Sequence, residues 1–336
     1  MRRSQLLFPL LAFLVLDCTR ERGTHPSGQA PEAPSTVPAA DVSHGEAAIG
    51  TADTAPIDPV APPRSTARLQ RIRIEIRHTK VTIAPGITYD AWTFDGRVPG
   101  PVVRVTVGDT VDFTLVNRAP MPHSMDFHAA EIAPDRAYVN VLPGDSLHYR
   151  FVARVVGAFL YHCGTAPVAM HIANGMYGAI LVDPRQARSP AREFVLVQSE
   201  FYTQKAGGPD SSALALDWPK LLGLAPDYVT FNGRSAQYAT APIVVRPTEP
   251  IRLYVVNAGP NQISAFHVVG AIFDHVYLDA STTPSLSGVQ TVNVPVGGGA
   301  IFEVRLVEPG AYPFVTHAFA DATKGAVGIL RAKEQP

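Results

Sequence analysis

Cysteine is almost absent from this chain, which has only Cys18 and Cys163 in 336 residues. Two cysteines cannot build a disulfide framework. An excess of charge of one sign is also lacking, because charged residues make up 17% of the chain and the formal net charge is −1. Proteins that bind nucleic acids usually carry a basic excess, so no nucleic-acid partner is expected. The 31 prolines and 26 glycines, with many Val and Thr, are typical of β-structure with many turns.

The N-terminus has the pattern of an export signal. Arg2 and Arg3 precede an apolar run, residues 6–16, that is too short to span a bilayer. Cys18 ends this signal, residues 1–18, and resembles the acylated cysteine of a bacterial lipoprotein, although Asp17 stands where a small residue is usual. We therefore expect an exported protein, either periplasmic or held at a membrane by a lipid anchor on Cys18.

Two similar segments follow a polar tether. Residues 19–65 are rich in Pro, Ala, Ser, Thr and Gly, which predicts a disordered linker. From residue 66 onward, strand-like passages occur twice: TFDGR recurs as TFNGR, GAFLYHC as GAYPFVTH, and MYGAILV as KGAVGIL. This repetition predicts an all-β fold of two tandem β-sandwiches, residues 66–186 and 190–334. A short helix is expected between them, in SSALALDWPKLLGLAP.

The segment YHCGTAPVAMHIANGMYG contains the strongest chemical signal. Cys163, His171 and Met176 follow the spacing Cys-x7-His-x4-Met. A thiolate, an imidazole and a thioether on one loop, with a second imidazole from elsewhere, form the ligand set of a blue-copper electron-transfer site. A single cysteine is more often a buried free thiol, but the His and Met at these offsets favour the metal site.

Strand periodicity divides the histidines of the first segment into two sets. Residues an odd number apart in a strand face opposite sides, so His123 and His128 should diverge. His162 and Cys163 should diverge for the same reason, whereas Asp126 should share the side of His128. His123 then joins Cys163, His171 and Met176, and His128 joins His162 and Asp126.

Two imidazoles are too few for a second metal, and the second segment offers further histidines. His317 lies in a passage that echoes the His162 passage, and His267 lies in AFHVVG. The remaining histidines fall in patterns typical of exposed strand positions or of the tether: His78, His148, His275, His25 and His44.

Residues 66–334 resemble the copper-containing nitrite reductases. The motifs HxxDFH, YHC, MHIANGMYG, FHVVGxxFDxVY and THAF…KG occur in the family's order. The chain departs from the family after DFHAA, where EIAPDRAYVNV replaces a Gly-rich segment, and at FADAT, where FRAFN is usual. These departures lie close to the expected substrate pocket.

The resemblance implies two cupredoxin-like Greek-key β-sandwiches, a homotrimer and two coppers per chain. It implies one-electron reduction of nitrite to nitric oxide, with the electron supplied by a periplasmic cupredoxin or c-type cytochrome and passed from a type 1 to a type 2 copper. Asp126 and His267 are implied to handle protons. The implied type 1 ligands are His123, Cys163, His171 and Met176, and the type 2 ligands are His128 and His162 of one chain and His317 of the next.

Two alternatives differ from this reading in copper content. A two-domain multicopper oxidase needs paired His-x-His motifs, and the chain has none, with His162-Cys163-Gly164 at the thiolate. A non-enzymatic carrier would hold only the type 1 copper, which leaves His128, His162 and His317 without a role. Copper per chain separates the three: about one for a carrier, two for the reductase and four for the oxidase.

Overall fold

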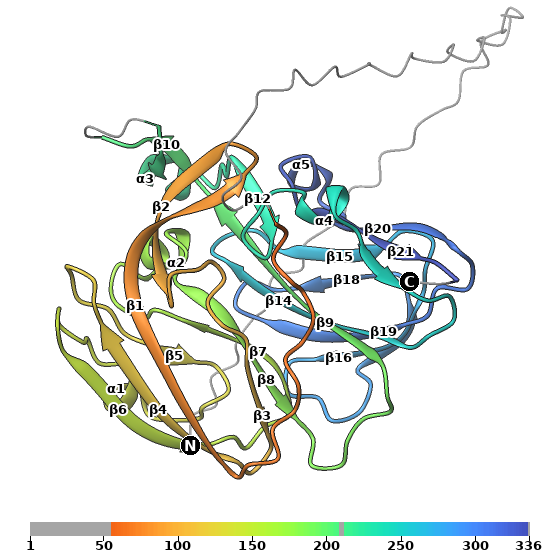
Figure 1. The fold of residues 1–336 in the computed structure, drawn as a ribbon, viewed down its shortest axis with the longest axis horizontal. Coiled ribbons are helices and arrows are strands. Elements are labelled where there is room, and N and C mark those ends of the chain that lie inside the picture. The colour runs from red at the N-terminus through yellow and green to blue at the C-terminus, as the bar shows by residue number, and fades with distance from the viewer. Residues whose placement is uncertain (1–54, 208–211, 335–336) are drawn as a thin grey trace, which may run out of the picture. The chain divides into compact units, whose positions relative to one another are not determined.

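The computed structural model describes residues 55–207 and 212–334. The predicted signal, its Cys18 and the tether up to residue 54 lie outside these residues. The described chain forms two β-sandwiches in tandem, as the repeats predict, with the first drawn in orange to green and the second in green to blue (Figure 1). No described helix has the length and apolar content to cross a membrane.

The first sandwich consists of a six-stranded and a four-stranded sheet. The six-stranded sheet has the order β10 (Thr203–Lys205), β11 (Leu214–Leu216), β2 (Ile87–Phe94), β1 (Leu69–Ala84), β4 (Thr110–Asn117), β6 (Ser146–Val152). The four-stranded sheet has the order β3 (Val103–Thr106), β8 (Tyr177–Asp183), β7 (Gly157–His162), β5 (Asp126–Phe127). Strands β10 and β11 belong to the predicted second segment by sequence but extend the first sandwich.

The second sandwich repeats this plan with a six-stranded and a five-stranded sheet. The first has the order β12 (Tyr228–Phe231), β9 (Arg192–Phe201), β14 (Ile251–Gly259), β19 (Gly299–Val304), β16 (Phe273–Leu278), β17 (Leu286–Val289). The other has the order β13 (Ile243–Val245), β21 (Val327–Ala332), β20 (Gly310–Thr316), β15 (Ser264–Val268), β18 (Thr291–Val294).

The described helices are short and lie in the connections between strands. They are α1 (Pro134–Ala137), α2 (Val168–Ala173), α3 (Trp218–Leu222), α4 (Gln237–Thr240) and α5 (Phe319–Ala322). Helix α3 lies where the sequence predicts a short helix, and the Asp217 side chain caps it by accepting a hydrogen bond of 2.9 Å from the Lys220 backbone N–H.

Strand β7 is buried along its whole length because it has a core on each side. Phe159 and Tyr161 point into the core of the first sandwich. Ala158 and Leu160 point the other way, into a separate cluster shared with strands β9, β14 and β19 of the second sandwich. The alternation of a strand therefore gives two chemically different faces to the residues that follow β7.

An asparagine turn occurs at the same place in both sandwiches. Asn117 ends β4 and donates to the Met121 and Val141 carbonyls at 2.8 and 2.9 Å. Asn257 in β14 donates to the Gln262 and Val294 carbonyls at 2.8 and 3.1 Å. The repeat read from the sequence therefore extends to individual hydrogen bonds.

Backbone contact and buried ion pairs join the sandwiches. Gly299 lies against the Ala158 carbonyl of β7 with no room for a Cβ atom. Arg104, on β3, pairs with Asp183 at 2.7 Å and with Glu193 of β9 at 2.7 Å. Only 4% of the Arg104 side chain is exposed, so these carboxylates are needed to balance a buried charge.

The described end of the predicted tether is held on the fold. Val60 forms a β-bridge with Phe194, and the Ala61 N–H donates to the Glu193 carbonyl at 3.0 Å. The Tyr238 hydroxyl donates to the Ile57 carbonyl at 2.8 Å. Backbone pairing of this kind does not depend on apolar side chains, which is why composition alone did not indicate it.

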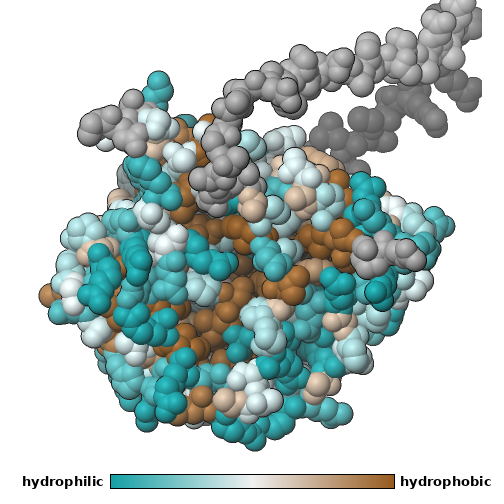
Figure 2. Space-filling view, in the orientation of Figure 1, coloured by the Kyte–Doolittle hydropathy of each residue, from teal (hydrophilic) through white to brown (hydrophobic). Residues whose placement is uncertain are grey.

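Figure 2 shows apolar surface gathered near the middle of the face drawn, with hydrophilic residues around it.

Candidate metal centres

The two faces of β7 carry the key histidine and cysteine to opposite sides. Cys163 follows β7 with the parity of Tyr161, and its buried thiol belongs to the core of the first sandwich. His162 has the parity of Leu160, which packs in the cluster shared with the second sandwich. Strand β5 pairs with β7 so that Asp126 lies opposite His162.

One group of ligand atoms lies inside the first sandwich. The Nδ1 atoms of His123 and His171 are 3.1 Å apart. The Cys163 Sγ lies 3.2 Å from the His171 Nδ1 and 3.9 Å from the His123 Nδ1. All three side chains are fully buried, and their ligand atoms converge within 4.8 Å.

Short local segments position this group. His171 lies on α2, and the Met176 N–H donates to its carbonyl at 3.1 Å. The buried Met176 is held beside the cysteine, because its own carbonyl accepts the Cys163 N–H at 3.1 Å. The Ser124 N–H donates to the Cys163 Sγ at 3.3 Å.

Burial keeps both imidazoles of this group neutral. Desolvation, followed by the nearby His171 and His78 rings, lowers the pKa of His123 to about 3. Desolvation, followed by His78, lowers the pKa of His171 to about 4. Neutral imidazole is the form that binds a metal ion.

A second group lies on the opposite side of β7. The His128 and His162 Nε2 atoms are 3.0 Å apart. The Asp126 Oδ2 lies 3.8 Å from the His162 Nε2, and the three ligand atoms fall within 4.8 Å of one another. This group and the buried one divide the residues as strand parity predicts; their roles as ligands stay predictions.

Backbone carbonyls fix the ring orientation in this second group. The His128 Nδ1 lies 3.0 Å from the Gly297 carbonyl, and the His162 Nδ1 lies 2.8 Å from the Cys163 carbonyl. A carbonyl can only accept, so both Nδ1 atoms carry hydrogen. Two bare Nε2 lone pairs would then face each other at 3.0 Å, an arrangement that requires a cation between them.

His267 and His317 lie together on the second sandwich. Their rings are 5.4 Å apart, and His317 also contacts Phe319. The His267 Nδ1 lies 2.7 Å from the Gln290 carbonyl and 3.3 Å from the Thr291 hydroxyl, so its Nε2 is left for another partner. Among the described residues, neither histidine belongs to a group that could hold a metal within one chain.

The interpretation of His78 as an exposed strand residue is wrong. Its Nε2 lies 3.0 Å from the His123 Nε2, and its ring stacks on Trp92 at 5.0 Å and 7°. Burial lowers the pKa of His78. The alternation of residues along the strand could have indicated this, because His78 lies on the same face of β1 as Ile74 and Ile76, which are buried.

Tyr138 is a further residue that the sequence did not single out. It follows α1 in the segment that departs from the family, and its hydroxyl donates to the Phe127 carbonyl at 3.5 Å, next to Asp126 in the sequence. Burial, and then the charge of Asp126, raise the pKa of Tyr138, so the phenol stays a neutral donor. No sequence pattern links it to Phe127, because the contact depends on the path of a loop.

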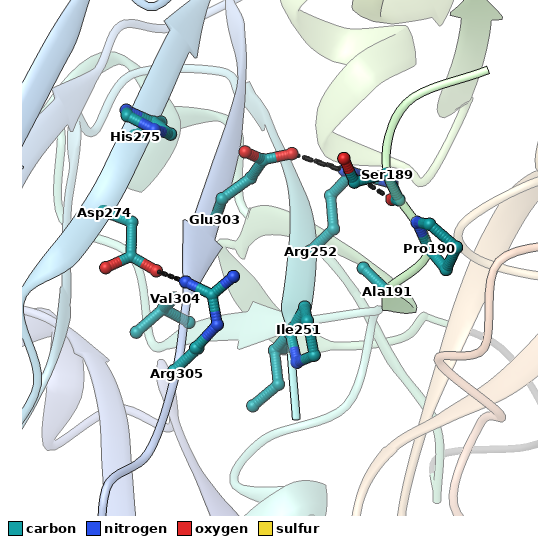
Figure 3. Close-up of a pocket in the computed structure, with 11 residues that line it drawn as sticks. Ser189, Pro190, Ala191, Ile251, Arg252, Asp274, His275, Glu303, Val304 and Arg305 are labelled. Atoms are coloured by element: carbon teal, nitrogen blue, oxygen red, sulfur yellow. Dashed lines mark hydrogen bonds and ion pairs between the residues drawn. The ribbon is translucent and has the colours of Figure 1, made fainter. Parts of the chain in front are cut away.

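A surface pocket of about 200 Å³ is not part of either group (Figure 3). Its walls carry ion pairs: Arg252 bonds Glu303 at 2.8 Å, and Arg305 bonds Asp274 at 2.7 Å. The exposed His275 at its edge bonds the Ser287 hydroxyl. The charges are neutralised by one another, and the pocket offers no cluster of metal ligands.

Comparison with known proteins gives one consistent result. The multicopper oxidase family model matches residues 75–187. The copper-containing nitrite reductase of Neisseria meningitidis is 39% identical over 285 residues, 83% of this chain and 73% of that protein. Its counterpart from Neisseria gonorrhoeae is 38% identical over 91% of this chain and 83% of that protein. The solved copper nitrite reductase of Nitrosomonas europaea superposes with a TM-score of 0.73 and 36% identity, over 80% of this chain and 95% of that chain.

Proposed function

This chain belongs to the copper-containing nitrite reductases, and from that premise we propose that it reduces nitrite to nitric oxide at two copper sites built from the two groups of ligand atoms. The balanced reaction is NO2⁻ + 2 H⁺ + e⁻ → NO + H2O. The chain must therefore supply a route for one electron and for two protons.

The facing Nε2 atoms of His128 and His162 carry the proposal. Their Nδ1–H groups donate hydrogen bonds to carbonyl oxygens, so the Nε2 atoms carry lone pairs and face each other at 3.0 Å. Two facing lone pairs repel each other unless a cation lies between them. A proton could occupy this position, but burial lowers the pKa of His162 and disfavours a protonated ring. A metal ion meets the requirement at neutral pH.

The donor sets fit copper in two different roles. The proposed type 1 ligands, His123, Cys163, His171 and Met176, combine nitrogen with soft sulfur in a buried site. The proposed type 2 ligands, His128, His162 and His317, are all imidazoles. His128 and His317 are exposed, so a small anion can reach the set, whereas His162 is buried. Bound copper would supply a one-electron change at the first set and Lewis acidity toward a nitrite oxygen at the second.

Adjacent residues connect the two sets. Cys163 belongs to one and His162 to the other, so a single peptide unit joins them through covalent bonds. The His162 Nδ1–H also donates to the Cys163 carbonyl at 2.8 Å. This hydrogen bond gives the electron a second path between the imidazole and the cysteine backbone, with fewer bonds than the path through the peptide unit.

Asp126 and His267 are the proposed proton donors. The Asp126 Oδ2 lies 3.8 Å from the His162 Nε2. His267 keeps its Nε2 free because Nδ1 is bonded to the Gln290 carbonyl. A carboxyl group and an imidazole are suitable proton donors in mildly acidic to neutral solution.

We further propose a homotrimer in which His317 of one chain completes the site of its neighbour. His128 and His162 come from the first sandwich, and His317 comes from the second without joining them in the described chain. A closed ring repeats this heterologous contact and yields one complete site per interface. The same proposal includes export, either to the periplasm or to a membrane through a lipid anchor on Cys18, and a periplasmic cupredoxin or c-type cytochrome as electron donor.

The direct test is nitric oxide release from nitrite by copper-loaded protein with a chemically reduced donor. We expect about two coppers per chain and steady nitric oxide production. The variant His128→Ala should lose activity and one copper, whereas the control His148→Ala, an exposed histidine on β6, should lose neither. One copper per chain with no nitric oxide would favour the electron carrier, and about four coppers with oxygen consumption would favour the oxidase.

A further inference from the structure

The His78 ring contacts the ligand group from outside it. Its Nε2 lies 3.0 Å from the His123 Nε2, whereas the His123 Nδ1 faces His171 and Cys163. The nitrogen of a ligating imidazole that does not bind the metal carries hydrogen and needs an acceptor. In the described chain, the His78 Nε2 occupies that acceptor position.

Trp92 holds the His78 ring in place. The two residues are cross-strand partners in the β1–β2 pair, and their rings stack at 5.0 Å and 7°. The same indole meets His123 and His171 edge-on, at 5.6 and 4.9 Å. The Trp92 ring thus packs against both proposed ligand imidazoles, His123 and His171, and also against His78.

The second ligand histidine has no comparable partner. The His171 Nε2 is buried without a hydrogen bond in the described structure. His123 is therefore the ligand whose orientation and basicity the protein controls through a hydrogen bond. An acceptor on the far N–H makes an imidazole a stronger electron donor to its metal.

The second sandwich uses the equivalent position in the same way. Ile76 pairs with Asn117, and Gln198 pairs with Asn257, so the positions two residues further on are His78 and Glu200. The Glu200 carboxylate accepts the Asn261 and Gln262 N–H groups at 3.1 and 2.6 Å, just after the Asn257 turn.

We propose that His78 is a positioning residue for the first metal site, which accepts the His123 Nε2–H and thereby fixes His123 with Nδ1 toward the metal. This inference rests on the proposed function, because it takes His123 as a copper ligand. With His78 as acceptor, the oxidised metal is favoured, since a more basic ligand stabilises the higher charge.

The variant His78→Leu removes the acceptor, and His78→Gln keeps one as an amide oxygen. The control is His275→Leu, an exposed strand histidine that bonds Ser287. Reduction potential, visible absorption spectrum and copper content are measured in all four proteins. We expect a higher potential and a shifted thiolate–copper band in His78→Leu, recovery toward the original values in His78→Gln, and no change in the control.

Equal potentials and spectra in His78→Leu and His275→Leu, at equal copper content, would overturn the assignment. Absence of the thiolate–copper band from the unmodified protein would instead refute the proposed function, so the two failures are distinct. If His78→Leu does not fold, selective ¹⁵N-histidine NMR of the unmodified copper(I) protein decides the point. A His78 ring with hydrogen on Nδ1 and none on Nε2 supports the proposal, and hydrogen on the His78 Nε2 contradicts it.

Discussion

Complementation between two inactive variants measures how the second copper site is shared. His128→Ala removes a ligand from the first sandwich, and His317→Ala removes one from the second. If each site takes His128 from one chain and His317 from the next, a site is complete only where an intact His128 meets an intact His317. In a random equal mixture, each condition holds for about half of the chains, so about a quarter of the interfaces are competent.

The expected activity therefore depends on the mixing ratio in a defined way. It should reach roughly a quarter of that of the unmodified protein at equal amounts and fall toward zero when either variant dominates. Trimers purified by two different tags, one on each variant, should each contain one competent interface out of three. Nitric oxide release per mixed trimer would then be about a third of the original.

Two controls make the result decisive. A mixture of differently tagged chains that all carry His128→Ala should stay inactive at every ratio. Chains carrying His148→Ala, whose histidine lies on the exposed face of β6, should be active alone. If doubly tagged trimers of the two ligand variants form and produce no nitric oxide, the site lies within one chain and the shared-site proposal is refuted.

Four further outcomes are expected. Cys163→Ser should abolish the visible thiolate–copper band while the second copper remains, and a retained band would contradict the type 1 assignment. Met176→Leu should keep the colour and raise the reduction potential, because only a weak axial ligand is lost; an unchanged potential would exclude Met176 as a ligand. Asp126→Asn and His267→Ala should each lower turnover about 10²-fold with both coppers bound, and original rates would refute their proton roles. The pKa of His123 is lowered to about 3 in the folded chain, whereas an unfolded histidine has a pKa of about 6.5. Between these values the His123 ring binds a proton only in the unfolded chain, so the free energy of unfolding of the copper-free protein, measured with urea, should fall as the pH is lowered from about 6.5 toward 3. The loss should be smaller in His123→Gln, and an equal loss in both proteins would contradict this cause.

The division of the histidines could be predicted because it depends on strand alternation alone. Strand β7 has a core on each face, so Cys163 and His162 separate as any two neighbours in a strand do. The asparagine turns and the paired strands of the second sandwich follow from the same repetition. Their sequences echo one another because they form the same hydrogen bonds.

Contacts made by loops and across sheets could not be predicted in the same way. The hydrogen bond from Tyr138 to the Phe127 carbonyl depends on how the segment around α1 returns to the sheet. The His78 contact with His123 depends on the loop after β4 folding back over β1, although parity already placed His78 on the buried face. The pairing of Val60 with Phe194 involves backbone groups, which are the same in every sequence.

The close approach of Gly299 to Ala158 has a consequence for rebuilding this protein. The backbone of Gly299 packs directly against the backbone of Ala158, so backbone atoms set the distance between the two sandwiches. This distance does not depend on the identity of a side chain. Two residues earlier in the sequence, the Gly297 carbonyl accepts a hydrogen bond from the His128 Nδ1–H. If the first sandwich were transferred to another scaffold, His128 would be included, but the Gly297 carbonyl that orients its ring would not. The first sandwich is therefore a poor interchangeable module, even though it holds most of the proposed ligands.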